Sequence, residues 1–231
     1  MLRENNHEHN VSQTRREGRI GLIANKYLKR IRAAPGKKIR LGDFSTDWAQ
    51  ERDLKDAEKE AFKEKALKIL DENRAALASA QELLWASNVY SILIILQGMD
   101  TAGKDGTIKH VLSGVNPQGC KVHSFKVPTE EELDHTFLWR FWRALPNRGE
   151  IGIFNRSYYE DVLVVKVHPE RLRNLPPGKI GKKFWNARYE DINTFEQHLA
   201  RNGTIILKFF LHISREVQKK RLLDRLNDDD K

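Results

Sequence analysis

The sequence predicts an α/β domain in which helices cover both faces of a parallel β-sheet. Three observations predict this fold: strand-like apolar runs alternate with segments of helical periodicity, the first of these runs is almost purely aliphatic, and a glycine-rich loop follows it. Strands that alternate with helices form right-handed crossovers, which put ligands at the carboxyl ends of the strands. Functional residues are therefore expected in the loops after the strands.

The chain of 231 residues is expected to begin with an irregular N-terminal arm over 1–50, followed by the α/β domain over 51–231. Residues 1–17 are polar without a pattern, and residues 30–48 mix Pro, Gly and basic side chains. From Asp53 to about Ala86, apolar residues recur close to the 3.6-residue period of a helix. We interpret this segment as one long helix that braces the domain by packing.

The rest of the domain is predicted as four strands, each followed by a helix. The run from Val89 to Leu96 is β-branched and aliphatic except at Tyr90 and Ser91, which is typical of a strand buried on both faces. Thr129 and Glu132 have the spacing of a capping box, and Gly203 ends a helical segment. The predicted strands span 89–96, 121–127, 150–157 and 204–214, and the predicted helices span 107–113, 129–145, 184–203 and 215–227.

The formal charge is +9, from 41 Lys and Arg against 32 Asp and Glu. This balance favours an anionic partner such as nucleic acid, an acidic surface or a phosphate-rich substrate, and it also fits a basic protein with no such partner. The longest apolar runs fall short of the roughly 18–20 residues that span a bilayer, and the N-terminus lacks the apolar segment of a secretory signal. With the single Cys120, which excludes an internal disulfide, this predicts a cytoplasmic protein with no membrane partner.

The loop after the first strand, "LQGMDTAGKDGTIKH", has the spacing of a phosphate-binding P-loop. Gly98, Gly103 and Lys104 match G-x-x-x-x-G-K, and the loop lies between a predicted strand and a predicted helix. Glycines let successive backbone N–H groups point at phosphate oxygens, and the lysine adds a positive charge. A chance glycine turn is the alternative. The predicted phosphate-binding residues are Gly98, Gly103, Lys104, Asp105, Gly106, Thr107 and Arg156.

Asp105 stands where a P-loop normally carries the Ser or Thr that holds magnesium. Magnesium must therefore find other oxygen ligands. Asp100 lies within the loop, and "FNRSYYEDV" after the third strand supplies further oxygens and, in Arg156, a bidentate phosphate donor. Alternatively, Glu160 and Asp161 stand at the N-terminus of a helix, where acidic side chains interact favourably with the helix dipole. The predicted metal ligands are Asp100, Asn155, Glu160 and Asp161.

Three long blocks of the sequence resemble the polyphosphate kinase 2 family: "QGMDTAGKDGTIKHVLSGVNPQG", "SFKVPTEEELDHTFLWRFWRALPNRGEIGIFNRSYYEDVLVVKVHPE" and "FEQHLARNGTIILKFFLHIS". The resemblance runs through most of the chain from about Lys26. It implies a P-loop kinase-like, three-layer αβα core similar to thymidylate kinase. It also implies an enzyme that moves a phosphoryl group between inorganic polyphosphate and a nucleotide with magnesium.

The resemblance also implies roles for individual residues. Asp100 is similar to the loop aspartate that binds magnesium and positions the acceptor phosphate, while Lys104 and Arg156 are similar to phosphate-binding cations. These three are the predicted catalytic residues. Many family members have Asp in place of Asn155 and Asn in place of Glu160. The version found here resembles the subgroup that accepts both AMP and ADP.

The partners implied by the resemblance are inorganic polyphosphate and AMP, ADP and ATP, with no nucleic acid, in a homo-oligomer. In the family, a helix similar to "KKRLLDRLNDDDK" leads into a lid with a Trp-Lys-Phe-Ser type motif that closes over both substrates. This sequence ends at Lys231. We therefore expect an incomplete C-terminal lid, in a piece of a longer protein or in a homologue without the second half of the lid.

Two other functions compete with this interpretation. An ATP-dependent nucleoside monophosphate kinase would share the architecture but should carry the Ser or Thr that Asp105 replaces. A non-catalytic polyanion-binding module for polyphosphate or nucleic acid would suit the charge of +9, but not four oxygen ligands around one loop.

Further side chains have two interpretations each. Trp139, Phe141 and Trp142 have the spacing of core packing and could otherwise stack on a base. The histidines show no spacing typical of a zinc site and are expected on surfaces and helices. The remaining basic residues either face a phosphate channel or lie on a solvated surface: Lys109, Lys126, Arg140, Arg143 and Lys166.

Overall fold

The structure is a computed structural model, and it describes residue 28 and residues 31–34, 36–46, 56–172, 175 and 178–227. Contacts within the chain define two compact units, 1–48 and 49–231. In the first unit, Leu41–Asp43 forms a short 3-10 helix, η1, without buried residues. The predictions for residues 1–17, and the start of the helix predicted from Asp53, lie outside the described residues.

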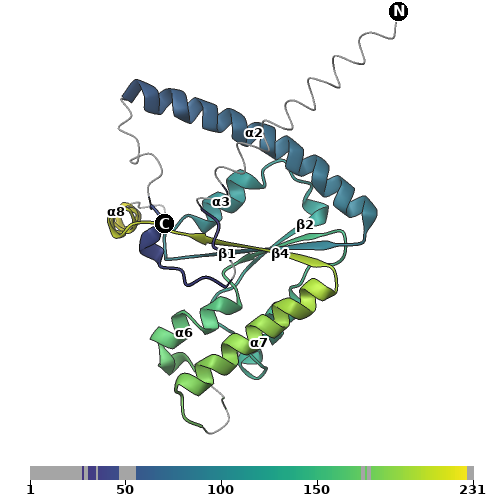
Figure 1. The fold of residues 1–231 in the computed structure, drawn as a ribbon, viewed down its shortest axis with the longest axis vertical. Helices are drawn as coiled ribbons and strands as arrows, with labels where there is room; N and C mark the ends of the chain where they lie inside the picture. The colour runs from purple at the N-terminus through teal and green to yellow at the C-terminus, as the bar shows by residue number, and fades with distance from the viewer. Residues whose placement is uncertain are drawn as a thin grey trace, which may run out of the picture. The chain divides into compact units, whose positions relative to one another are not determined.

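The second unit contains a four-stranded sheet in which every described strand pair is parallel, as the sequence predicts. Its order is β2-β3-β1-β4 (Figure 1). The connection from β1 to β2 runs to one side of β1, and the connection from β3 to β4 runs to the other. The carboxyl ends of β1 and β3 therefore form a topological switch point, at which connections leave adjacent strands in opposite directions. Ligands of parallel sheets usually bind at such a point. The strands span β1 Ser91–Gly98, β2 Cys120–Ser124, β3 Ile151–Asn155 and β4 Thr204–Leu211.

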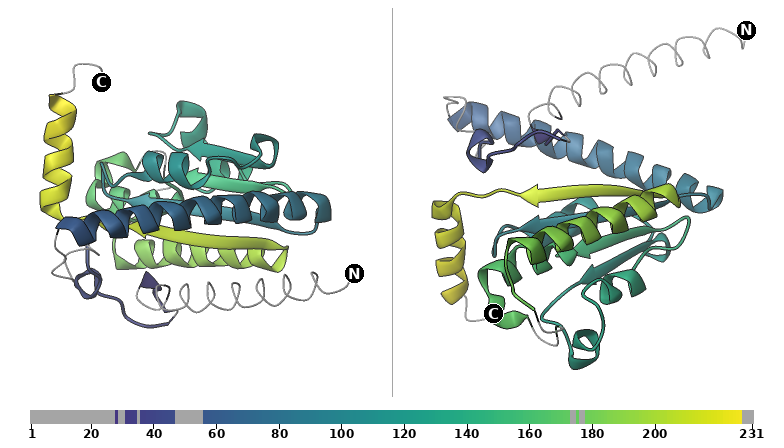
Figure 2. Two further views of the ribbon diagram at one scale, coloured as in Figure 1. Left: turned by 90° about the horizontal axis from the view of Figure 1, so that it is seen from above. Right: turned by 60° about the horizontal axis from the view of Figure 1, so that its bottom comes forward.

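Helices cover both faces of this sheet, which completes the predicted three layers (Figures 1 and 2). One face carries α2 (Asp56–Ser87) and α3 (Lys104–Val111), and the other carries α6 (Val164–Val167) and α7 (Lys182–Arg201). Figure 2 shows α8 (Arg215–Leu226) standing across the end of the sheet at which β4 ends. The carboxyl ends of the strands thus face α8.

The residues of β1 alternate between two cores. Leu93 and Ile95 are buried on the side of α7, whereas Leu96 is buried on the side of α2 and α3. Since successive side chains of a strand point to opposite faces, a continuous aliphatic run is what a strand between two helical layers needs. The first core contains Leu93, Ile95, Phe141, Phe154, Tyr158, Val162, Ile192, Phe195 and Leu199.

The single helix predicted over 129–145 is wrong: the structure forms two short helices, α4 (Glu130–Leu133) and α5 (Trp139–Arg143). The capping box between Thr129 and Glu132 is confirmed. The five residues between the helices begin with Asp-His-Thr, three weak helix formers, which explains why the helix stops there. Phe141 is fully buried in α5, so core packing is confirmed for it.

Several boundaries also differ from the prediction. Helix α3 begins at Lys104, three residues before the predicted start. The third strand ends at Asn155 and passes into the 3-10 helix η3 (Tyr158–Asp161), which the sequence did not predict. Two further 3-10 helices are η2 (Pro117–Gly119) and η4 (Pro169–Arg171). Among the helices that the structure describes, none combines the length and the apolar character that crossing a membrane requires.

Candidate active site

The P-loop connects the end of β1 to the first turn of α3, and its shape depends on two glycines. Gly103 has φ +96°, a conformation that other residues rarely adopt. At Gly98, an added Cβ would lie 2.9 Å from the backbone oxygen of Leu211. Thr101 also has a positive φ, +61°, which is unusual for a β-branched residue and stores strain in the loop.

Lys104 is buried within this loop, and its ammonium donates to the carbonyl oxygens of Gly98 and Met99, both at 3.1 Å. Burial and, next, the charge of Arg156 lower the pKa of Lys104. The ammonium therefore lies inside the ring of backbone groups that an incoming phosphate would contact.

Asp105, in the first turn of α3, accepts a hydrogen bond of 2.6 Å from the Nδ2 atom of Asn155 at the end of β3. The same nitrogen lies 3.3 Å from Oγ of Ser124 on β2. An amide on the strand thus faces a carboxylate on the helix, which gives the unusual residue after Lys104 a partner. Because the side-chain nitrogen is engaged in this way and the backbone oxygen accepts from the N–H of Phe125, the side-chain oxygen Oδ1 of Asn155 is the atom that could face a metal. The roles of both residues in binding stay predictions.

Arg156 follows Asn155 with φ +67° and lies between two of the predicted metal ligands. Its Nη1 is 3.3 Å from Oε2 of Glu160, and its Nη2 is 4.0 Å from Oδ1 of Asp100. The other oxygen of Glu160, Oε1, accepts a hydrogen bond of 3.0 Å from Nε2 of Gln97, a buried side chain at the end of β1. The guanidinium therefore connects the P-loop to the segment after β3.

The four predicted metal ligands do not form a single cluster. Asp161 points to Arg188 on α7, and across the described ranges no three His, Cys, Asp or Glu residues lie close enough to hold a metal ion. Asp100 and Glu160 do share the Arg156 guanidinium. Magnesium is commonly held by one or two carboxylates together with substrate phosphates, so this pair fits such a site.

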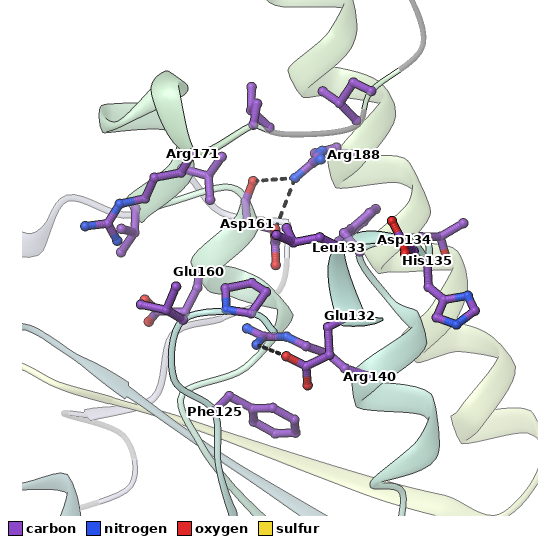
Figure 3. Close-up of a pocket in the computed structure, with 18 of the residues that line it drawn as sticks. Phe125, Glu132, Leu133, Asp134, His135, Arg140, Glu160, Asp161, Arg171 and Arg188 are labelled. Atoms are coloured by element: carbon purple, nitrogen blue, oxygen red, sulfur yellow. Dashed lines mark hydrogen bonds and ion pairs between the residues drawn. The ribbon is translucent and has the colours of Figure 1, made fainter. Parts of the chain in front are cut away.

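A cavity of about 1180 Å³ opens beside Arg156 and Glu160, between α4, α5 and α7 (Figure 3). Its inner wall includes Arg140, whose guanidinium carbon lies 5.4 Å from the ring centre of Phe125 and whose Nη1 is 3.3 Å from Glu132. Sequence reasoning missed this cavity because its walls come from four separate segments. They lie within residues 125–140, 156–165, 170–175 and 184–191.

Helix α8 contacts the other side of the P-loop. The side chains of Gln218 and Arg221 donate to the carbonyl oxygens of Asp100 and Thr101, at 3.1 and 2.9 Å. Arg225 lies 3.8 Å from the Asp100 carboxylate. A second cavity, of about 490 Å³, lies between this helix and the loop. Sequence reasoning missed these residues, although their three- and four-residue spacing puts them on one helix face.

The weaker basic candidates separate into two groups. Lys126 and Arg140 line the large cavity. Arg143 lies over Trp139 and pairs with Glu131 instead. Lys109 is exposed in the last turn of α3. Lys166 contacts the rings of Trp185 and Tyr189.

The family model described as Polyphosphate kinase 2 (PPK2) matches residues 57–231. The chain belongs to this family. The match covers the P-loop, the segment after β3 and every described helix that lines the large cavity, so the resemblance read from the sequence is confirmed.

Two curated relatives of this PPK2 chain are similar over most of its length. An ADP-polyphosphate phosphotransferase of Rhodopseudomonas palustris is 50% identical over 206 residues, 88% of this chain and 68% of that protein. An AMP/ADP-polyphosphate phosphotransferase of Meiothermus ruber is 44% identical over 204 residues, 88% of this chain and 70% of that protein.

Among solved structures, polyphosphate kinase 2 from Arthrobacter aurescens TC1 superposes with a TM-score of 0.72 at 37% identity. That match covers 87% of this chain and 66% of the other chain. The PPK2 chain thus spans about two thirds of the length of these relatives, and the P-loop kinase-like fold class is confirmed.

Proposed function

We propose that this chain transfers a phosphoryl group from inorganic polyphosphate to AMP or ADP, reversibly and with magnesium. Its family and the polyphosphate phosphotransferases at 50% and 44% identity support this function. The activity of a whole protein of which this chain forms a part belongs to the same proposal.

The observation that carries the proposal is the position of Arg156. This guanidinium lines the large cavity and also lies between a carboxylate of the P-loop, Asp100, and one of η3, Glu160. A cation at this junction can bind phosphate oxygens of a donor on the loop and of an acceptor in the cavity. Phosphoryl transfer needs the two phosphates held in line with their charge neutralised, so one bridging cation suits the reaction.

The donor polyphosphate is assigned to the P-loop. Gly103 shapes the backbone so that N–H groups can surround a phosphate, and Lys104 supplies a charge inside the loop. Arg221 and Arg225 of α8 add two cations at the rim of this loop. These two arginines can bind phosphate units of a polyphosphate chain that extend beyond the one held in the loop.

The acceptor nucleotide is assigned to the large cavity. Its volume of about 1180 Å³ is ample for a nucleoside, and Phe137, Leu133 and Val164 offer apolar contacts to a base. Arg156 also lines this cavity, and the acceptor phosphate would lie beside it. Both AMP and ADP fit a cavity of this size, which agrees with the subgroup that the "FNRS-x-YED" segment resembles.

Magnesium, when bound, would neutralise charge on the donor and acceptor phosphates, and Asp100 and Glu160 are the carboxylates that would hold it. In the step itself, an oxygen of the acceptor's terminal phosphate attacks the terminal phosphorus of polyphosphate. The bond from that phosphorus to its bridging oxygen breaks, and polyphosphate leaves one unit shorter. Lys104 and Arg156 stabilise the charge that develops on the transferred group.

The proposal includes three further predictions: the protein is cytoplasmic, it regenerates ATP from ADP, and it forms a homo-oligomer. The single Cys120 agrees with a reducing compartment. The oligomer rests on the family resemblance, and light scattering after size exclusion tests it directly, with a monomeric mass as the contradicting result.

The decisive experiment is incubation with AMP or ADP, magnesium and long-chain polyphosphate, without ATP, followed by nucleotide chromatography. We expect ADP from AMP and ATP from ADP, with the much slower Lys104→Ala variant as the control. Comparable rates with ATP as the sole donor for AMP would favour an ordinary monophosphate kinase. Polyphosphate binding without any nucleotide product would favour a polyanion-binding module.

A further inference from the structure

Arg188 is a buried cation that no motif of the sequence singles out. It lies on the core-facing side of α7, only 7% exposed, in the same stripe as the apolar Trp185 and Ile192. Its Nη1 donates to the backbone oxygen of Asp161 at 3.1 Å and to the Oδ1 atom of the same residue at 3.3 Å (Figure 3). Its guanidinium also lies over the rings of Phe137 and Phe184, at 4.5 and 5.0 Å.

Stability alone does not explain such a residue. Burying a guanidinium is costly, and replacing a buried ion pair by apolar side chains of similar size is often neutral or stabilising. An apolar residue at 188 would continue the stripe of α7, but it could not donate to a carbonyl oxygen and a carboxylate. The guanidinium can donate to the backbone and carboxylate oxygens of Asp161 in one fixed geometry, which indicates that the position of Asp161 has to be fixed.

Asp161 is the last residue of η3, next to Glu160. Glu160 contacts both Gln97 of β1 and Arg156, so a shift of η3 moves a carboxylate that faces the P-loop. Arg188 contacts Asp161 and two aromatic rings, and among the described residues none of its hydrogen bonds or ring contacts reaches the P-loop. Arg188 itself lines the large cavity, and its hydrogen bonds connect it to the P-loop side of the site by way of η3.

The other end of η3 is also held by α7. The hydroxyls of Tyr158 and Tyr159 donate to the same oxygen of Glu196, at 2.9 and 2.7 Å. Glu196 and Arg188 lie about two helical turns apart on α7. Because the short segment is fixed at both ends by one rigid helix, it cannot rotate while both contacts are present. Without Arg188 it would be held at one end only.

We propose that Arg188 is a positioning residue. By holding Asp161 against α7, it fixes η3, so that the Glu160 carboxylate and the Arg156 guanidinium keep their positions relative to the reacting phosphates. This inference rests on the proposed function. It assigns to a residue of the acceptor cavity a role in the rate of transfer rather than in nucleotide affinity.

The test is a double-mutant cycle between Arg188→Gln and Glu160→Gln, with kcat and KM measured for AMP, ADP and polyphosphate. We expect Arg188→Gln to lower kcat about tenfold or more and to change the KM for AMP less than about threefold. In the Glu160→Gln background, Arg188→Gln should lower kcat less than about twofold further, because the residue through which it acts is already lost. Arg188→Lys should recover part of the loss.

The matched control is Arg74→Gln. Arg74 also donates to a carbonyl oxygen, that of His110, and to a carboxylate, that of Asp71, but it lies on α2 across the sheet. We expect unchanged kcat for this variant. If Arg188→Gln does not fold, Arg188→Lys and Asp161→Asn carry the same cycle.

Equal losses of kcat from Arg188→Gln in both backgrounds would overturn the assignment, since the residue would then not act through Glu160. Full activity of Arg188→Gln would overturn it as well. A wild type without polyphosphate-dependent transfer overturns the proposed function and this inference with it, whereas an active wild type with an additive cycle overturns this inference alone.

Discussion

The P-loop and η3 lie on either side of Arg156, yet they are built in different ways. The loop takes its shape mainly from its own residues: Gly103 has a positive φ, and Lys104 donates to carbonyl oxygens of the loop itself, while Gln218 and Arg221 of α8 donate to two further carbonyl oxygens. In η3, by contrast, side chains of α7 hold the segment at both ends, through Glu196 and Arg188.

The two halves of the site should therefore be sensitive to different substitutions. The loop depends on glycines and on one charge, so it should fail when a Cβ or a lost ammonium alters it locally. The segment η3 depends on residues distant in the chain, so it should fail when those partners are removed. Substitutions in the two regions should therefore differ in how they affect rate and stability.

The largest effect is expected for Lys104→Ala. Removing the cation from the loop should cost several kcal/mol of transition-state stabilisation, on the order of a hundredfold or more in kcat. The fold should remain intact, as judged by circular dichroism. A variant that retains nearly normal turnover would remove the P-loop from the mechanism.

The next largest effect is expected for Glu196→Ala, which tests the side-chain support of η3. Burial raises the pKa of Tyr159 to about 12; the hydrogen bond from Lys208 lowers this pKa, and Glu196 raises it. The hydroxyl of Tyr159 therefore remains a donor at neutral pH. Loss of the shared acceptor leaves two phenols and the Lys208 ammonium without their carboxylate. We expect a loss of about 2–3 kcal/mol in the free energy of unfolding, measured by urea titration. Glu196→Gln, which keeps an acceptor oxygen, should lose less, and equal losses would argue against the network.

A smaller effect on stability is expected for Gly98→Ala, paired with Gly106→Ala as its control. The added Cβ at 98 would lie 2.9 Å from the backbone oxygen of Leu211, whereas the added Cβ at 106 has open space. We expect the first to destabilise by about 1–3 kcal/mol. The second should be neutral or stabilising by up to about 1 kcal/mol, because Ala is the better helix former. The reverse order in thermal unfolding would contradict this account of the loop.

The same contrast explains what the sequence could predict. The P-loop was recognisable because its residues are consecutive and its glycines mark backbone conformations directly. The run of Val89 to Leu96, aliphatic except at Tyr90 and Ser91, likewise indicated a strand between two helical layers, although the strand itself begins at Ser91.

The large cavity and its supports were not predictable in this way. Arg188 and Glu196 read as ordinary polar residues of a helix, and only the packing of α7 against η3 gives them partners. The break between α4 and α5 was missed because the apolar residues around it keep a helical period. Pairing of Asp105 with Asn155 joins residues from a helix and a strand that are distant in sequence, which no local pattern reveals.

The smallest effect is expected for the double variant Asn155→Asp with Glu160→Asn. It would put a carboxylate beside Asp105, where Asn155 now donates a bond of 2.6 Å, and remove one beside Arg156. Because charge moves rather than vanishes, we expect a few-fold change in the ratio of rates with AMP and ADP. Initial rates at saturating polyphosphate measure this ratio. An unchanged ratio would place acceptor choice elsewhere in the nucleotide site.

In the proposed function, polyphosphate binds to the P-loop and the nucleotide binds in the large cavity beside η3. Isothermal titration of tripolyphosphate and of AMP, each alone, against Lys104→Ala and Leu133→Trp tests this most directly. Leu133 lines the cavity, so the larger side chain should fill it. We predict that Lys104→Ala weakens only tripolyphosphate binding and that Leu133→Trp weakens only AMP binding. Loss of both ligands in one variant, or the opposite pairing, would contradict the account.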